Sequence, residues 1–138
     1  MNAIMFRLAR CITFGTLALA ITSASVLAAD TYPTKSIRLI VPFAAGGGTD
    51  AVARTVAQSL SRRLSQPVDV DNRGGGGGTI GTMAVVQAPA DGYTLLLGTN
   101  ATMVLNPLLH PSIKYRVDKD LVPVGGIASV SYLSLIHI

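Results

Sequence analysis

This sequence contains a single cysteine, Cys11, and no glutamate, so all seven acidic residues are aspartate. Because Cys11 lies in the apolar N-terminal stretch, the chain from residue 30 onward contains no cysteine. This excludes disulfides, a thiolate nucleophile and cysteine-based metal sites from that part of the protein. A cysteine-free chain suits an oxidising compartment, a property that many cytosolic proteins share.

Residue clusters that would perform catalysis or bind a metal are missing as well. His110 and His137 stand alone, and neither has metal-ligand partners at a suitable spacing. No serine-nucleophile motif occurs, and no lysine follows a glycine run as a phosphate-binding P-loop requires. We therefore expect no catalytic residue, no metal and no cofactor, and a protein that is not an enzyme.

Positive charge is sparse beyond the first ten residues. The formal net charge is +4, of which Arg7 and Arg10 supply two, so the remainder carries +2. That remainder has no dense run of lysine and arginine and few aromatic residues among its charges. These features give no support to nucleic-acid binding, and we expect no nucleic-acid partner.

Residues 1–29 have the three parts of a secretory signal peptide. Arg7 and Arg10 form its positive segment, and no charge follows them as far as Ala29. The apolar core is short for a membrane span, which needs about 20 residues, and small residues stand where a signal peptidase reads. We expect cleavage after Ala28 or Ala29 and export to the periplasm.

Signals for strands and helices alternate along the rest of the chain. Apolar runs typical of buried strands occupy 37–41, 68–70 and 93–97, and helical patterns occupy 49–64, 79–88 and 101–105. Such alternation predicts an α/β fold with a mainly parallel sheet and covering helices.

The helix predicted at 49–64 has one apolar face, and Thr49 or Asp50 is expected to cap its N-terminus. The face consists of apolar side chains that recur every four residues and of two alanines beside them: Val52, Val56, Leu60, Leu64, Ala53 and Ala57.

The length beyond the signal peptide bounds the domain organisation. Residues 30–138 suffice for one modest lobe. Within them, 110–124 is predicted to be irregular, and 127–138 is an apolar, strand-like run without neighbours to pair with. We therefore expect the incomplete first lobe of a larger protein, with 133–138 as a candidate non-native tail.

Glycine-rich loops follow the first two predicted strands. Loop one (42–50) contains three consecutive glycines and loop two (73–78) contains five. Glycine lets a ligand approach the backbone closely, and the helix that follows each loop offers free N–H groups and a positive dipole end to an anion. Two such helix starts favour a ligand with carboxylates, and Gly78 and Thr79 are candidate ligand-binding residues at the second. Alternatively, the glycines only make tight turns and allow close packing.

The sequence leaves two roles open for Asp50 at the end of loop one. It caps the helix and pairs with the helix dipole, or it accepts a hydrogen bond from a ligand ammonium or an ordered water. A third loop (98–100) follows the last predicted strand, and its small polar residues Thr99 and Asn100 suit the orientation of a carboxylate.

Two other functions compete with carboxylate binding. A loose dinucleotide-binding glycine pattern begins at Gly46 and a strict one at Gly76, with Asp69 or Asp71 near the ribose position. These patterns fit a Rossmann-type, nucleotide-binding oxidoreductase fragment. The remaining alternative is an exported interaction module without a small ligand.

Loop one and several later segments match a known family. The matching segments are 33–50, 66–68, 72–73, 77–81, 90–96 and 106–107. They resemble the Bug-type receptors, the periplasmic solute-binding proteins of tripartite tricarboxylate transporters, over residues 31–132. Loop one and the Asp-Gly-Tyr-Thr segment (91–94) together are quite specific to this family.

The resemblance implies a two-lobed receptor of Venus-flytrap type, which closes by hinge motion around a small carboxylate. The implied ligand is a dicarboxylate, a tricarboxylate or an acidic amino acid, delivered by a monomeric receptor to membrane permease subunits. Residues of loop one that match the family's ligand-binding motif are Phe43, Ala45, Gly46, Gly47, Thr49 and Asp50. Thr99 and Asn100 match a second contact region. The five glycines of loop two depart from the mixed stretch usual in the family, and most of a second lobe is missing.

Overall fold

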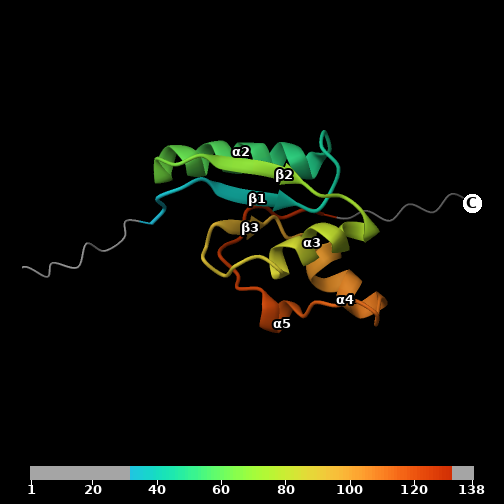
Figure 1. Ribbon diagram of the computed structural model, residues 1–138. Helices are drawn as coiled ribbons and strands as arrows, with labels where there is room; N and C mark the ends of the chain where they lie inside the picture. Colours follow the sequence, from blue (N-terminus) through green and yellow to red (C-terminus); the bar gives the residue numbers. More distant parts are fainter. Residues whose placement is uncertain (1–31, 132–138) are drawn as a thin grey trace, which may run out of the picture. The chain divides into compact units, whose positions relative to one another are not determined.

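The computed structural model describes residues 32–131. Contacts divide the chain into one unit that ends at Tyr32 and another that begins at Pro33, and every element below belongs to the second (Figure 1). The signal peptide expected at 1–29 and the tail expected at 133–138 lie outside the described residues. Within residues 32–131, no helix has the length and apolarity needed to cross a membrane.

In the described part of the chain, three parallel strands form a sheet in the order β2-β1-β3. The strands are β1 (Ile37–Val41), β2 (Val68–Asn72) and β3 (Thr94–Leu96). Four of the five residues of β1 are buried, as expected for an aliphatic strand covered on both faces of a parallel sheet. The prediction of an α/β fold with a parallel sheet is confirmed.

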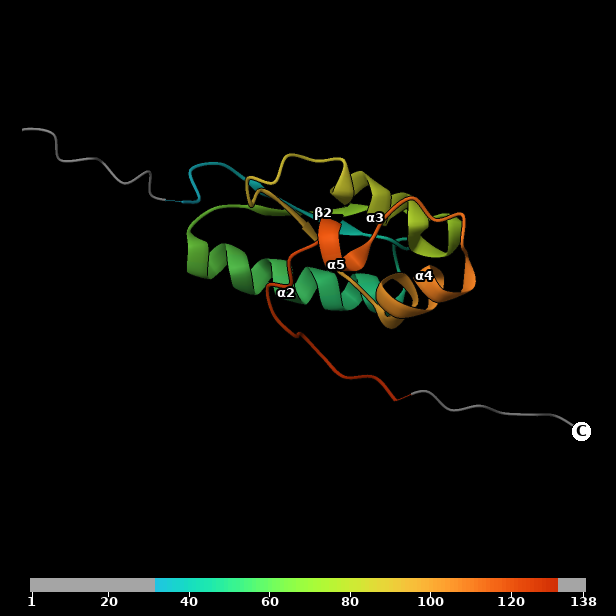
Figure 2. The same ribbon diagram turned by 90° about the horizontal axis from the view of Figure 1, so that it is seen from below.

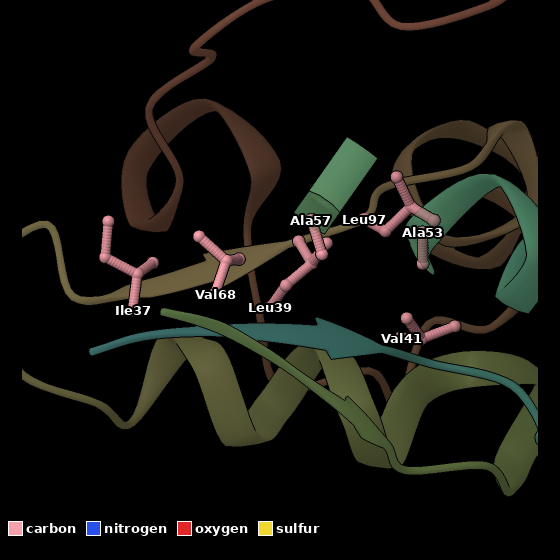
Figure 3. Close-up of a cluster of buried hydrophobic side chains, with 7 residues drawn as sticks. All are labelled: Ile37, Leu39, Val41, Ala53, Ala57, Val68 and Leu97. Carbon is pink, nitrogen blue, oxygen red and sulfur yellow. The ribbon is translucent and has the colours of Figure 1, made fainter. Parts of the chain in front are cut away.

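Helices connect the strands on opposite faces of the sheet. Helix α2 (Gly48–Leu64) runs from β1 to β2, and α3 (Thr79–Val86) runs from β2 to β3. The second connection returns across β1, so the right-handed rule for crossovers places α3 on the face opposite α2. Figure 3 shows the two helices on either side of the strands.

The main hydrophobic core lies between α2 and the sheet (Figure 3). Alternate side chains of β1 meet two alanines of α2, which allow the helix to approach the sheet closely. The cluster comprises Ile37, Leu39, Val41, Ala53, Ala57, Val68 and Leu97, with Leu60 and Leu64 partly buried against it. Val52, predicted on the same helix face, is 39% exposed, because the alanine side of α2 faces the strands.

Helix ends differ from the sequence prediction. The N-cap of α2 is Gly47, with no side-chain cap, so neither Thr49 nor Asp50 is the cap. Helix α3 ends at Val86, two residues before the predicted end. The predicted short helix at 101–105 is the π-helical turn η2 (Ala101–Leu105).

Three further differences lie beyond η2. The chain goes directly from η2 into the short helix α4 (Asn106–Leu109), which has Pro107 in its own first turn. A short helix α5 (Val117–Asp120) interrupts the stretch predicted to be irregular. Residues 127–131 form no strand, so the strand predicted there is wrong for its described part, where no partner strand pairs with it.

The Asp-Gly-Tyr-Thr segment fastens the chain entering β1. The Tyr93 hydroxyl accepts a hydrogen bond from the Thr34 N–H at 2.9 Å. Lys35 Nζ lies 4.2 Å from the centre of the Tyr93 ring and 3.4 Å from Asp91 Oδ2. Asp91 Oδ1 accepts the Tyr93 N–H at 3.0 Å, and Gly92 has a φ of +80°. The segment is therefore a turn that binds the start of β1 to the start of β3.

Helix α3 approaches the end of β1 through a glycine. A Cβ atom on Gly81 would lie 2.7 Å from the Arg73 carbonyl oxygen and 2.7 Å from Pro42 Cα. Both neighbours are backbone atoms, which cannot give way as the end of a flexible side chain can. Gly48, at the start of α2, has no such neighbour within 4 Å.

We expect Gly81→Ala to destabilise the fold by about 1–3 kcal/mol through overpacking. Gly48→Ala is the matched control, and it should be neutral or stabilise by up to about 1 kcal/mol because it restricts the unfolded chain. The midpoint of urea unfolding measures both effects. Equal midpoints for the two variants would contradict the close packing at Gly81.

Candidate functional site

Three loops meet at the carboxyl edge of the sheet. Loop one leaves β1, loop two leaves β2, and loop three follows β3, whose pairing extends to the Leu97 N–H donating to the Ile40 carbonyl at 2.9 Å. Strand β1 lies between β2 and β3, so successive connections run in opposite directions from it. In open α/β sheets, ligands bind outside the strand ends at such a switch point. By this rule, the strand order favours the edge formed by loops one and three as the place for a ligand.

Loop one presents main-chain donors to solvent. Gly46 has a φ of +85° and Gly47 is extended, which turns the chain sharply into α2. The first intrahelical bond runs from the Ala51 N–H to the Gly47 carbonyl at 3.1 Å, so the N–H groups of the preceding turn have no acceptor within the helix. Residues 44–48 are exposed, and their backbone is open to an anion.

Asp50 lies beneath this loop with only 5% of its surface exposed. Its Oδ2 accepts the Gly46 N–H at 2.9 Å and the Arg54 Nε at 3.0 Å. The Gly46 N–H first, and Arg54 second, hold the pKa of the Asp50 carboxyl below its ordinary value of 3.8 against the opposing effect of burial. The carboxylate therefore stays ionised and fixes the bend of loop one.

The second oxygen of this carboxylate is unsatisfied. Among the described residues, Asp50 Oδ1 is a buried side-chain atom that has no hydrogen-bond partner. The Asn72 amide also helps to lower the pKa of Asp50, but its Nδ2 donates to the Phe43 carbonyl at 3.3 Å. A buried charged acceptor without a donor of its own is costly, so Oδ1 can accept a further hydrogen bond. The structure thus assigns Asp50 to the first turn of α2 with one oxygen committed to the loop and one unused.

Two side chains that the sequence analysis did not select support loop one. Arg54 stands one helical turn after Asp50, and the signal for it is the acid–base pair at i, i+4. Asn72, the last residue of β2, donates from Nδ2 to the Phe43 carbonyl at 3.3 Å. An asparagine at a strand end is common in turns, so its sequence position carries little signal.

Loop two packs against loop one and α4. The residues from Gly75 to Gly78 all have positive φ, and Asn106 Nδ2 donates to the Gly77 carbonyl at 2.8 Å. The Gly78 N–H already donates to the Gly75 carbonyl at 3.0 Å. A Cβ on Gly78 would lie 2.5 Å from Thr102 Cγ2. Close packing accounts for this glycine, and half-buried Thr79 begins α3 beside it.

Loop three is a hydrogen-bonded turn. The Thr99 N–H donates to Thr102 Oγ1 at 3.0 Å, and that hydroxyl donates to the Thr99 carbonyl at 3.1 Å. Tyr115 fixes the turn from outside by donating its hydroxyl to the Thr102 carbonyl at 2.6 Å. Thr99 is half-buried and Asn100 is exposed, so the asparagine is the freer of the two to reach a ligand.

The site gives no positive support to metal binding or to Rossmann-type nucleotide binding. In the described ranges, no three His, Cys, Asp or Glu side chains gather where they could hold a metal ion. A Rossmann unit places its third strand beyond the second, in the order 3-2-1, whereas β3 here pairs with β1. Asp71, near the ribose position of that reading, is paired with Arg73 at 2.9 Å.

An α/β lobe with backbone-lined loops at a strand switch point is typical of periplasmic binding proteins. Residues 52–137 match the family described as "Tripartite tricarboxylate transporter family receptor". The chain belongs to this family, whose members are periplasmic solute-binding proteins.

Individual relatives agree with this assignment. BugT of Bordetella pertussis is 50% identical over 108 residues, which cover 78% of this chain and 33% of BugT. A solved structure of a periplasmic transporter is 50% identical with a TM-score of 0.59, covering 61% of this chain and 28% of that one. MatC from Rhodopseudomonas palustris, solved with bound malate, is 39% identical with a TM-score of 0.62, covering 64% and 30%. The chain spans about a third of the length of the curated relatives it matches.

Asp50→Asn should flatten the acid limb of the stability curve. Because the folded state lowers the pKa of Asp50, its stabilising contribution is fully present above about pH 4. That contribution is lost as the pH falls through the lower, folded-state pKa. Urea midpoints measured down to about pH 2 should therefore fall less steeply for Asp50→Asn than for the unchanged chain.

Asp118→Asn is the matched control, because Asp118 pairs with Arg116 at 3.0 Å where both side chains are exposed. Solvent screens such a pair, so this substitution should alter the acid limb much less. An acid limb as steep in Asp50→Asn as in the unchanged chain would show that Asp50 is not held by loop one.

Proposed function

We propose that loop one and the first turn of α2 hold a carboxylate group of a small ligand in a periplasmic solute receptor. The observation that carries the proposal is Asp50: it is buried under the exposed N–H groups of the loop and has an unpartnered Oδ1. Because Gly47 is the N-cap, the start of α2 does not need Asp50 as its cap, and an apolar residue at position 50 would leave no buried acceptor there. A carboxylate with an unused oxygen instead suits a site where a ligand or its ordered water supplies the donor.

The chemistry of capture follows from these groups. Free main-chain N–H groups and the positive end of the α2 dipole attract the ligand carboxylate. The negative charge of Asp50 opposes anions that bring no donor, so it selects ligands that arrive with an ammonium group or a bridging water. Loop three, on the neighbouring strand, supplies further polar groups.

The residues proposed to surround the ligand are Phe43, Ala45, Gly46, Gly47, Thr49 and Asp50 from loop one, Gly78 and Thr79 at the start of α3, and Thr99 and Asn100 from loop three. Gly78 acts through its lack of a side chain, because its N–H is already bonded. The ligand class is a dicarboxylate, a tricarboxylate or an acidic amino acid. Malate bound to MatC supports this class for a relative.

We propose the wider setting from the family membership and from the sequence of residues 1–29. The chain is exported by cleavage of the signal peptide at 1–29, and residues 30–138 supply part of one lobe. In the complete receptor a second lobe closes over the ligand. The closed, monomeric receptor then delivers the ligand to the permease subunits of its transporter.

Malate titration of a full-length chimera tests the site. Residues 33–131 replace the corresponding segment of MatC, and calorimetry measures the dissociation constant. We expect Asp50→Asn and Gly47→Val each to weaken binding by about tenfold or more, as loss of a charged hydrogen-bonding group or of backbone access does. Asp118→Asn, on α5, should change affinity by less than about twofold.

Unchanged affinity in both loop-one variants would contradict the site. Circular dichroism first establishes that each chimera is folded, so that lost binding is not lost structure. A folded chimera whose melting temperature no carboxylate raises would favour the interaction module without a small ligand, since a ligand that binds only the folded state must stabilise it.

A further inference from the structure

The helical stretch formed by η2 and α4 buries its polar residues and exposes its apolar ones. Thr102 is fully buried and Asn106 is 8% exposed. On the other side, four large apolar side chains are between 44% and 74% exposed: Val104, Leu105, Leu108 and Leu109. A helix at the surface of a finished protein shows the opposite arrangement. We refer to these four residues as the α4 face.

Hydrogen bonds fix the helix in this orientation. Asn106 Nδ2 donates to the Gly77 carbonyl, Thr102 Oγ1 bonds to Thr99, and Tyr115 donates to the Thr102 carbonyl. Rotating the helix to bury its leucines would break these three hydrogen bonds and leave the polar groups without partners. The exposure of the α4 face is therefore built into the lobe.

The α4 face is continuous and uncharged. Its residues stand at i, i+1, i+4 and i+5, which places them along one side of a helix. No Asp, Glu, Lys or Arg occurs between Asp91 and Lys114. Monomeric proteins rarely leave a contiguous apolar patch uncovered, and depletion of charge marks the core of an interface.

We propose that the α4 face is an internal interface of the complete receptor, covered by polypeptide from the part of the receptor that this chain does not span. The solved and curated relatives are about three times as long as their match to this chain, so ample polypeptide exists to cover it. The segment after α5 also exposes apolar side chains, since Val122, Val124 and Val130 are at least 70% exposed.

Both views place α4 beside α3, near the end of the lobe where loops one and two lie (Figure 1, Figure 2). Polypeptide that covers the α4 face therefore contacts the element that holds loop two through Asn106. This contact joins the rest of the receptor to the ligand-binding edge without touching the ligand.

Cysteine labelling in a full-length chimera tests the proposal. Residues 33–131 replace the matching segment of BugT, and every other cysteine is changed to serine. Leu108→Cys should react with a maleimide about tenfold more slowly than Gln58→Cys, which stands on an exposed position of α2. In the 138-residue chain, with Cys11→Ser, the two positions should react at similar rates. A chimera in which Leu108→Cys reacts as fast as Gln58→Cys overturns the proposal.

A second variant measures the interface by stability. Leu108→Gln with Leu109→Gln should lower the melting temperature of the chimera by about 5 °C or more, while Val52→Gln, at an exposed apolar position of α2, should lower it by much less. An equal, small effect of both changes overturns the proposal. Light scattering measures whether the chimera is a dimer. A chimera that dimerises, and becomes monomeric on Leu108→Gln with Leu109→Gln, would overturn the proposal and show that a second copy covers the α4 face.

Discussion

Hydrogen bonding of β1 on both of its edges is the constraint from which the lobe is built. Strand β2 pairs with one edge and β3 with the other, all three in parallel. Parallel pairing sends each connection back over a face of the sheet, which requires α2 on one side and α3 on the other. The same pairing gathers the loops after the three strands at a single edge. The apolar sequence of Ile37–Val41 thus decides where the three loops meet.

Asp50 is the residue that connects this scaffold with the proposed binding of a ligand. Its carboxylate bends loop one through the Gly46 N–H and is kept ionised mainly by that bond and by Arg54. A residue that only capped a helix would leave its neighbours' backbone equally exposed to any anion. In the proposed site, the negative charge of Asp50 lies at the positive end of the α2 dipole, which combines attraction for a carboxylate with discrimination among carboxylates. Asn72 contributes from the adjacent strand by holding the Phe43 carbonyl.

Local sequence patterns were enough to predict the three strands and the long helix α2. The bounds of β1 follow from its aliphatic run, and the end of α2 at Leu64 follows from its periodicity. What the sequence could not reveal depends on distant contacts. Burial of the polar side of 101–109 arises from Asn106 meeting Gly77, which lies 29 residues earlier. The glycines of loop two suggested ligand access as readily as packing, and only the positions of Thr102 and Ala44 show how closely the backbone is approached. At the proposed site, Asp50 was visible in the sequence, whereas its unused oxygen is a property of the folded chain alone.

The Asp-Gly-Tyr-Thr segment has a bearing on how such receptors are classified. It is one of the segments that carry the sequence resemblance to the family, yet its contacts with Thr34 and Lys35 lie at the amino ends of the strands, away from the loops. A substitution in the loops can change the solute that is bound without disturbing these contacts. A sequence match to this segment therefore identifies the scaffold and carries no information about the solute.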